Sequence, residues 1–166
     1  MKKLMFVFVL ISSLVCSSVQ AGTIAGRVIR ITDGDTLVVI DSNNVQHKIR
    51  LMGIDAPENK QSYGKRSKDN LSGLVTGKHV VVEYDKRDWN KLIIGKVNLN
   101  GKDMNLEQVV SGMAWHYKEY QGEQSRTDQL LYSEAEVDAR SAKRGLWREP
   151  NPLPPREYRK LKKPED

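Results

Sequence analysis

The pattern of apolar and polar positions predicts short β-strands in the part of the chain before residue 100. β-branched residues gather in segments that Asp, Gly, Ser and Asn residues separate, as in strands joined by turns. The predicted strands are residues 24–31, 36–40, 45–52, 79–84 and 92–99. Asn100 and Gly101, at the end of the last strand, predict a hairpin turn.

Apolar residues at helical spacing predict three helices, each followed by a glycine. The first spans residues 63–75. The second spans residues 106–111, with Asn105 as its N-cap and Gln108 as the capping-box partner. The third spans residues 128–144, and its thin apolar stripe consists of Leu131, Ala135, Ala139 and Ala142.

Five short strands with helices between and after them predict an α+β protein, a five-stranded OB-fold β-barrel with three helices. The alternating strand-helix order of a doubly wound parallel sheet is absent from the predicted elements. We expect this domain at residues 22–149. Residues 150–166 hold five of the six prolines and several basic residues, so this C-terminal tail is expected to be extended, strapped to the surface or mobile.

The first 21 residues have the pattern of a signal peptide. Lys2 and Lys3 precede an apolar run, and Val19 and Ala21 have the small-residue spacing of a cleavage site. The alternatives are an uncleaved anchor or a buried helix, but the run is short for a membrane span. We therefore expect a secreted or periplasmic protein of bacterial export, without membrane contact after cleavage.

The net charge of +6 fits a polyanionic partner, and the length of 166 residues suits one domain. The single cysteine, Cys16, lies in the segment expected to be removed, which leaves no disulfide or thiolate site. The three histidines are far apart in sequence and lack zinc-ligand spacing.

Acidic residues at two strand ends are candidate ligands of a hard cation. Asp33 and Asp35 flank a glycine, where the alternative interpretation is a simple turn. Leu37 and Val38 exclude an EF-hand loop at this position. Asp55 at the end of the third strand would supply a second oxygen ligand and leave room for water and a phosphate oxygen.

Two further residues next to that strand end suit phosphate chemistry. Arg50 could form a bidentate contact with phosphate oxygens, and Glu58 could orient or deprotonate an attacking water. A surface ion-pair cluster is the alternative for any one of these residues. A surface cluster explains less well why all of these acidic and basic residues occur together.

In these motifs the sequence resembles the thermonuclease (micrococcal or staphylococcal nuclease) family. The matching motifs occur in family order over residues 24–159: Asp33-Gly34-Asp35-Thr36, Ile49-Arg50-Leu51, Gly53-Ile54-Asp55-Ala56-Pro57-Glu58, Tyr63-Gly64-Lys65, Asn105-Leu106-Glu107, Gly112-Met113-Ala114-Trp115 and Gly145-Leu146-Trp147. The resemblance implies the same barrel with three helices. It also implies a calcium-dependent endonuclease and exonuclease that cleaves the 5′-O–P bond of DNA and RNA and leaves 3′-phosphates.

Carried over by motif, the resemblance implies a role for each site residue. Asp35, Asp55 and the backbone carbonyl of Ala56 would bind Ca²⁺. Arg50 would hold the scissile phosphate, and Glu58 would act on the water. Tyr120, Tyr117 and Lys86 are candidate contacts to nucleic acid, with packing or a solvated surface as the alternative.

One position departs from the family pattern. The family's second catalytic arginine corresponds to Leu92, which can neither carry charge nor donate a hydrogen bond. Lys91 could substitute as a catalytic point charge, the activity could be reduced, or the local sequence could differ from the natural protein.

The predicted partners are DNA and RNA substrates, and we expect a monomer. The competing function is a weakly active or inactive OB-fold protein that binds nucleic acid, for which Leu92 is the supporting feature. A structural or adhesive exported protein is the poorer third class, because the carboxylates are retained at the metal positions.

Overall fold

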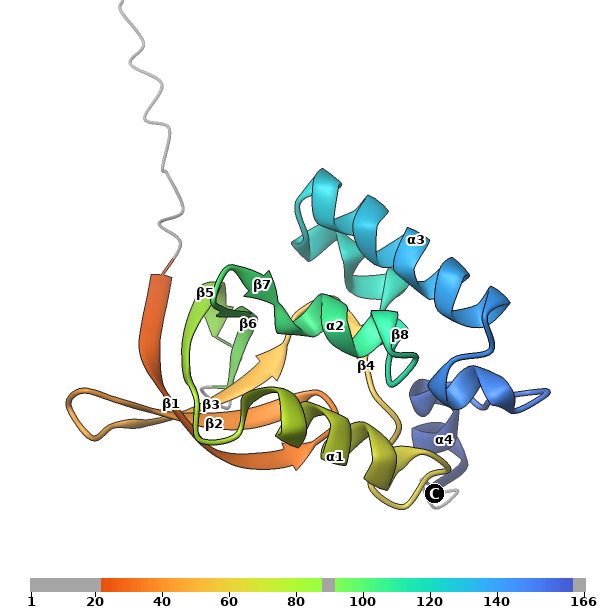
Figure 1. The fold of residues 1–166 in the computed structure, drawn as a ribbon, viewed down its shortest axis with the longest axis horizontal. Coiled ribbons are helices and arrows are strands. Elements are labelled where there is room, and N and C mark those ends of the chain that lie inside the picture. The colour runs from red at the N-terminus through yellow and green to blue at the C-terminus, as the bar shows by residue number, and fades with distance from the viewer. Residues whose placement is uncertain (1–21, 88–91, 163–166) are drawn as a thin grey trace, which may run out of the picture.

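Five strands close into a barrel in the computed structural model, which describes residues 22–87 and 92–162 (Figure 1). The barrel strands are β1 (Gly22–Asp33), β2 (Thr36–Asp41), β3 (Gln46–Leu51), β5 (His79–Arg87) and β6 (Ile93–Leu99). Neighbours in the order β3-β2-β1-β5-β6 pair antiparallel, and a parallel β3–β6 pairing closes the sheet on itself. The predicted α+β fold with a five-stranded OB-fold barrel is confirmed.

Alternation along the strands fills the barrel with branched apolar side chains. Val28, Leu37, Ile49, Val82 and Val97 are all completely or almost completely buried in one continuous core. Burial of such side chains is the main force that holds a small barrel together. The β1–β2 pairing has two register irregularities, which increase the local bend and twist that a closed sheet requires.

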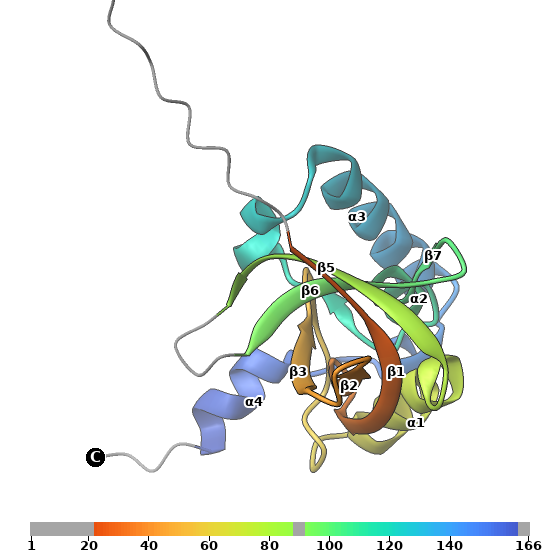
Figure 2. The same cartoon turned by 90° about the vertical axis from the view of Figure 1, so that its left-hand side faces the viewer.

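In the part of the chain that the structure describes, the barrel carries the three expected helices and a fourth. These are α1 (Gly64–Val75), α2 (Met104–Val110), α3 (Arg126–Ser141) and α4 (Pro155–Lys162). In Figures 1 and 2, α1 and α2 lie against the barrel, α3 covers α2 and α4 lies near the C-terminus. Shorter elements complete the fold: β4 (Ile54–Asp55), β7 (Lys102–Asp103), β8 (Trp115–His116) and the 3-10 helices η1 (Lys118–Glu123) and η2 (Gly145–Arg148).

The predicted cap of α2 is wrong. Asp103, not Asn105, is the N-cap, and its carboxylate accepts hydrogen bonds from the backbone N–H groups of Asn105 and Leu106 at 2.9 and 3.1 Å. The side chain of Asn105 is fully buried instead and donates to the backbone carbonyls of Met52 and Gly95. Tertiary hydrogen bonds to buried backbone groups decide the position of this side chain.

Gln108 also has a tertiary role in place of the predicted capping box. It is fully buried and donates to the backbone carbonyl of Gly34 at 2.7 Å and to that of Ser67 at 3.1 Å. The amide thereby connects α2 and α1 to the turn between β1 and β2. This turn is the one that holds Asp33 and Asp35.

The buried face of α3 differs from the predicted stripe. Leu131 is 45% exposed and Ala142 is exposed, whereas Tyr132, Glu136 and Ala139 are buried. Glu136 accepts a hydrogen bond from the backbone N–H of His116, and Tyr132 donates to Asp103. Two polar groups with partners therefore occupy the inner face, which an apolar pattern cannot reveal.

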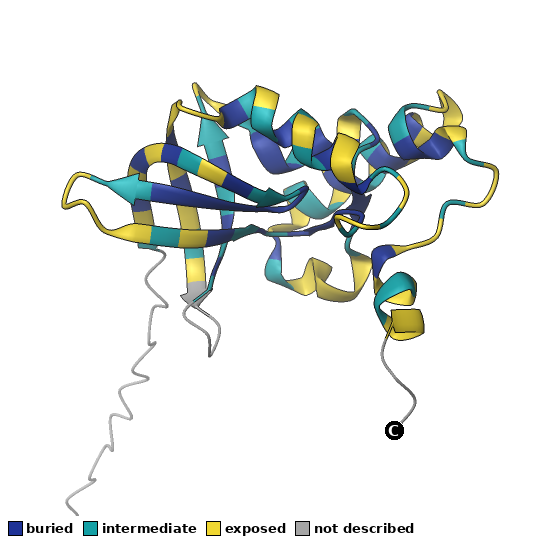
Figure 3. Cartoon of the chain, turned by 90° about the horizontal axis from the view of Figure 1, so that it is seen from below, coloured by how far each residue is buried: buried dark blue, intermediate teal, exposed yellow. Residues whose placement is uncertain are grey.

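The prediction of an extended C-terminal tail is wrong for Pro155–Lys162, which forms α4. Pro155 is the first helical residue, where its missing N–H costs no intrahelical hydrogen bond and its fixed φ angle suits a helix. In Figure 3 most of α4 is exposed, although Pro155 itself is buried. Among the described residues, no helix has both the length and the apolar character to cross a membrane.

Candidate active site

The turn between β1 and β2 places Asp35 beside β3. The backbone N–H of Leu51 donates to the carbonyl oxygen of Asp35 at 2.8 Å, and Thr36 pairs with Arg50 in the β2–β3 ladder. Gly34 permits this close packing, because a Cβ atom there would lie 1.9 Å from Oγ of Ser67. The local sequence Asp33-Gly34-Asp35-Thr36 thus brings one carboxylate to the strand that carries Arg50.

Asp55 reaches the same place from the short strand β4, which pairs with β8. The backbone N–H of the following residue, Ala56, donates to Oδ2 of Asp35 at 3.1 Å. Asp35 and Asp55 are only 6% and 3% exposed. This hydrogen bond joins the segment of Asp35 to the segment of Asp55, which is about twenty residues away in the sequence. The two buried carboxylates are therefore held close together.

Arg50 faces both carboxylates with one nitrogen atom. Its Nη2 lies 3.3 Å from Oδ1 of Asp55 and 3.7 Å from Oδ2 of Asp35. Its side chain is 34% exposed, so part of the guanidinium group remains open to solvent. A partly exposed guanidinium group next to two acidic groups can hold a phosphate if a cation takes over part of the carboxylate charge.

A cavity of about 200 Å³ connects the predicted residues. The residues that line it are Asp33, Asp35, Thr36, Lys48, Arg50, Ala56, Pro57, Glu58 and Leu92. Asp55 is joined to this lining through its ion pair with Arg50. The structure therefore brings Asp35, Asp55, Ala56, Arg50 and Glu58 together.

Burial and neighbouring negative charge raise the pKa of two carboxyl groups of the site, Asp33 and Asp55. Burial, followed by the charge of Asp35, raises the pKa of Asp33 to about 6. Burial also raises the pKa of Asp55, and the hydrogen bond and charge of Arg159 act in the opposite direction. A divalent cation would relieve this concentration of negative charge.

The donor chemistry fits a hard cation that takes part of its ligands from backbone carbonyls and water. No group of three or more His, Cys, Asp or Glu side chains arranged to hold an ion occurs within residues 22–87 and 92–162. Asp35 and Asp55 supply two carboxylates, and Ca²⁺ accepts carbonyl and water oxygens beside carboxylates. The residues present are compatible with that ion.

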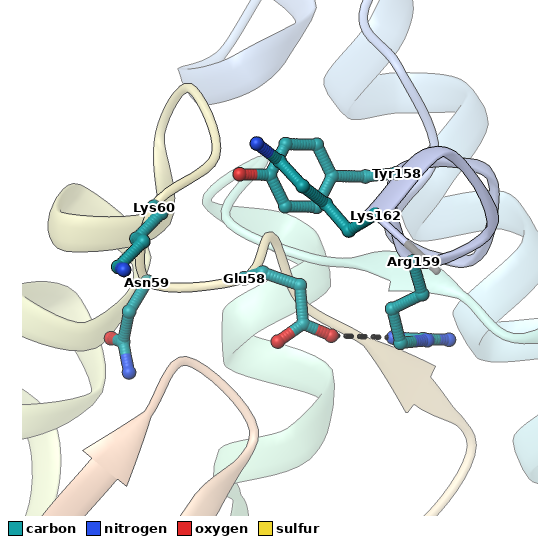
Figure 4. A pocket seen from close by; sticks show the side chains of 6 residues that line it. All are labelled: Glu58, Asn59, Lys60, Tyr158, Arg159 and Lys162. Atoms are coloured by element: carbon teal, nitrogen blue, oxygen red, sulfur yellow. Dashed lines mark hydrogen bonds and ion pairs between the residues drawn. The ribbon is translucent and has the colours of Figure 1, made fainter. Parts of the chain in front are cut away.

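Arg159 of α4 is a site residue that the sequence analysis missed. Its Nη1 and Nη2 atoms each lie 3.0 Å from one oxygen of Asp55, and Nη1 lies 2.8 Å from Oε1 of Glu58. Figure 4 shows the side chains of Glu58 and Arg159 facing each other from different segments. The only sequence signal was Pro155 followed by eight residues without Gly or Pro, which permits a short helix.

The aromatic candidates line a second cavity of about 500 Å³ beside the first. Tyr117 and Tyr120 have ring centroids 4.8 Å apart and share this cavity with Arg50 and Arg159. Lys86 lies in β5, on the strand that pairs with β6. Lys91, the predicted substitute for a second arginine, lies outside the described residues.

Known proteins are similar in sequence to this chain over most of its length. The family model of staphylococcal nuclease homologues matches residues 48–149. An uncharacterized endonuclease of Escherichia coli is 44% identical over 138 residues, which cover 82% of this chain and 86% of that protein. A micrococcal nuclease of Shigella flexneri is 35% identical over 147 residues, which cover 83% of this chain and 82% of that protein.

The region matched by the family model contains several residues of the candidate site. The family match spans more than half of the chain and includes Arg50, Asp55, Ala56 and Glu58. The predicted family and the predicted phosphodiester-cleaving enzyme class are confirmed. The chain belongs to the staphylococcal nuclease family and is a nuclease.

Proposed function

We propose that the protein is an exported, calcium-dependent nuclease that hydrolyses DNA and RNA with loose sequence preference and leaves 3′-phosphates. The main support for this proposal is the position of Arg50, whose Nη2 atom faces both Asp35 and Asp55. A cation held by these two carboxylates would lie next to a guanidinium group. That combination suits a phosphodiester, which carries one negative charge and gains another during attack.

Asp35, Asp55 and the carbonyl of Ala56 would hold the ion, with water and a phosphate oxygen completing its ligands. When bound, Ca²⁺ would stabilise negative charge on the phosphate oxygens. Asp33 helps to shape this region, because one of its carboxylate oxygens accepts a hydrogen bond from the backbone N–H of Asp35 at 3.2 Å. The ion would thus occupy a site in which backbone hydrogen bonds already orient the carboxylates.

The protein's own residues would handle the phosphate and the water. Arg50 would donate to the nonbridging phosphate oxygens, and Glu58 would accept a proton from the attacking water. The water oxygen forms the new bond to phosphorus, and the bond from phosphorus to the 5′ oxygen breaks. The leaving oxygen gains a proton from solvent, so the products are a 3′-phosphate and a 5′-hydroxyl.

The cavity lined by Tyr117 and Tyr120 supports binding of the nucleotide next to the scissile bond. Aromatic rings stack on any base, which would give binding without strong sequence preference. Lys86 is a further candidate for phosphate contact from β5. Binding through phosphate contacts should weaken as salt rises, because condensed counterions are released from the nucleic acid.

The test is hydrolysis of single-stranded DNA and RNA by purified mature protein with Ca²⁺ and with excess chelator. We expect calcium-dependent turnover that chelator abolishes. Asp35→Ala and Glu58→Ala should each remove turnover, while the control Asp69→Ala, on the exposed side of α1, should retain it. Equal hydrolysis in excess chelator would reject Asp35 and Asp55 as calcium ligands, and binding without any turnover would favour the binding-only alternative.

Export is proposed from the sequence of residues 1–21. Lys2, Lys3 and the apolar run that follows have the composition of a signal peptide, and Val19 and Ala21 have the spacing of a cleavage site. Mass spectrometry of protein recovered from a bacterial periplasm or medium should give a mature chain that starts at Gly22. A full-length chain retained in the cytoplasm would reject this part of the proposal.

A further inference from the structure

We propose that Arg159 is a catalytic residue, the second guanidinium group that donates to the reacting phosphate. This inference rests on the proposed nuclease function and extends it to a residue of the C-terminal helix. In hydrolysis, Arg159 would donate N–H groups to phosphate oxygens while water attacks phosphorus and the bond to the 5′ oxygen breaks. It would form no covalent bond and would transfer no proton.

The position of Arg159 relative to Asp55 and Glu58 is the first argument. The guanidinium group makes a bidentate pair with Asp55, with two N···O distances of 3.0 Å, and a third bond to Glu58 at 2.8 Å. Arg50 contacts the same Oδ1 atom of Asp55. Two guanidinium groups from opposite parts of the sequence therefore meet at one proposed calcium ligand.

The second argument is the hydrogen-bonding capacity that Arg159 retains. A guanidinium group has five N–H donors. Within residues 22–87 and 92–162, its bonds to Asp55 and Glu58 use both donors of Nη1 and one of Nη2. The Nε donor and one Nη2 donor remain for a phosphate, and the side chain is 37% exposed. A planar pair of donors suits the bidentate recognition of phosphate oxygens.

The third argument is where Arg159 lies along the expected path of the substrate. It lines the cavity of about 500 Å³ together with Arg50, Tyr117 and Tyr120. It also lines the cavity that contains Glu58 and Tyr158 (Figure 4). A nucleotide chain passing from the tyrosines to Glu58 would pass the guanidinium group.

The helix that carries Arg159 is held in place by contacts on both sides of the site. Arg156 forms an ion pair with Glu119 of η1. Just before the helix, the side chain of Gln61 donates to the backbone carbonyl of Leu153, and Pro155 is buried. Contacts outside the site therefore direct Arg159 toward Asp55.

The fourth argument is the apolar side chain in the cavity wall. Leu92 lines the cavity with Arg50 and Glu58, and its side chain has no hydrogen-bond donor. In phosphoryl transfer, a guanidinium group that stabilises the charge of the transition state can contribute a factor of roughly 10³ to 10⁵ in rate. Arg159 supplies such a group from α4, so turnover does not depend on a cation at position 92.

The same contacts would also allow Arg159 to block the site as an inhibitory cap. A catalytic Arg159 and an inhibitory Arg159 predict opposite effects of mutation on kcat. We would measure kcat and KM for a single-stranded oligonucleotide in Ca²⁺, together with calorimetric titration of each metal-free protein with Ca²⁺ alone. The variants are Arg159→Ala and Arg159→Lys. The control, Lys160→Ala, removes a long cationic side chain from an exposed position of the same helix, where its partner is Glu157. Urea unfolding would check that every variant is folded.

For Arg159→Ala we expect kcat to fall by roughly 10³-fold, with KM changed much less and Ca²⁺ affinity not weakened. Arg159→Lys should be intermediate, because an ammonium group keeps the charge without the planar fork. Guanidinium chloride at millimolar concentration should partly restore kcat in Arg159→Ala, and equal sodium chloride should not. The control should retain the parent kcat.

Three outcomes would overturn the catalytic role in an active parent protein. A higher kcat in Arg159→Ala would identify a cap, an unchanged kcat would identify a structural ion pair, and a loss explained by weaker Ca²⁺ binding would identify a positioning residue. A parent protein without calcium-dependent turnover would instead reject the proposed function, and the role of Arg159 with it.

Discussion

The carboxylate of Asp35 accepts a hydrogen bond from the backbone N–H of Ala56 at 3.1 Å, and this contact joins the two loops of the site. The hydroxyl group of Thr36 donates to the other carboxylate oxygen at 2.8 Å. Both oxygens of Asp35 are thus oriented by the protein itself. Because the carboxylate is already oriented, binding of a cation would cost less side-chain entropy.

Asp35→Asn should separate metal binding from loop geometry. The amide keeps a carbonyl oxygen that can accept from Ala56 but lacks the negative charge, so Ca²⁺ affinity should fall by at least about tenfold. Calorimetric titration of the metal-free protein measures this affinity. The metal-free variant should be no less stable in urea than the parent, because the repulsion between Asp33 and Asp35 is removed. An unchanged Ca²⁺ affinity would contradict the proposed ligand.

Gly34→Ala should disturb the same turn by crowding. The added Cβ would lie 1.9 Å from Oγ of Ser67 and 2.8 Å from Cβ of Ala56. We expect a loss of about 1–3 kcal/mol in the free energy of unfolding, measured in urea, together with weaker Ca²⁺ binding. Gly73→Ala is the matched control, because no atom lies within 4 Å of its added Cβ on α1. That change should stabilise the helix by about 0.5–1 kcal/mol.

Tyr120→Ala should weaken substrate binding more than chemistry. Tyr120 is 52% exposed, and its ring faces the cavity beside Arg50. Stacking of one base on an aromatic ring contributes about 1–3 kcal/mol, so KM for a short single-stranded oligonucleotide should rise by roughly tenfold. Steady-state kinetics would show this rise with kcat nearly constant. Tyr120→Phe keeps the ring and should behave as the parent, and a similar rise in both variants would reject stacking.

His116 should make stability depend on pH. Burial, and to a lesser extent the charge of Lys118, holds the pKa of His116 below its ordinary value of 6.5, although a hydrogen bond with Gln124 opposes this shift. Its Nδ1 atom has no hydrogen-bond partner among the described residues, so a proton there would lack an acceptor. The unfolded chain therefore binds more protons between the two pKa values, and the free energy of unfolding falls as pH drops below 6.5.

Urea unfolding on both sides of pH 6.5 would test this dependence. His116→Gln can still donate to Gln124 but cannot titrate, so its stability should depend less on pH than that of the parent. His79→Gln, at an exposed strand position, is the control and should follow the parent curve. Identical slopes in all three proteins would show that other groups cause the dependence.

Much of the site could be predicted from the sequence because its parts lie at strand ends. Asp35 lies in the turn between β1 and β2, and Asp55 and Glu58 come within a few residues after β3, so local strand patterns place them at one end of the barrel. The barrel itself follows from alternating β-branched residues with turn residues between them. The motif order then identifies which carboxylates belong together.

The remaining features depend on tertiary contacts that no local pattern contains. Arg159 and Asp55 are 104 positions apart, and their contact depends on how α4 docks. Asparagine is a common helix cap, but the side chain of Asn105 is buried in the protein and donates hydrogen bonds to two backbone carbonyl groups. The inner face of α3 contains Tyr132 and Glu136, so hydrophobic periodicity found Ala135 and Ala139 on this face but missed its two large polar side chains.

The docking of α4 ties the electrostatics of the site to a short helix that buries little of its own surface. An eight-residue helix is unstable in isolation, and α4 buries only Pro155. Amide hydrogens of such a segment exchange through local opening well before those of the barrel. Each opening would withdraw a positive charge from Asp55 and Glu58, so the electrostatic field of the site would depend on one peripheral element while the barrel stays folded.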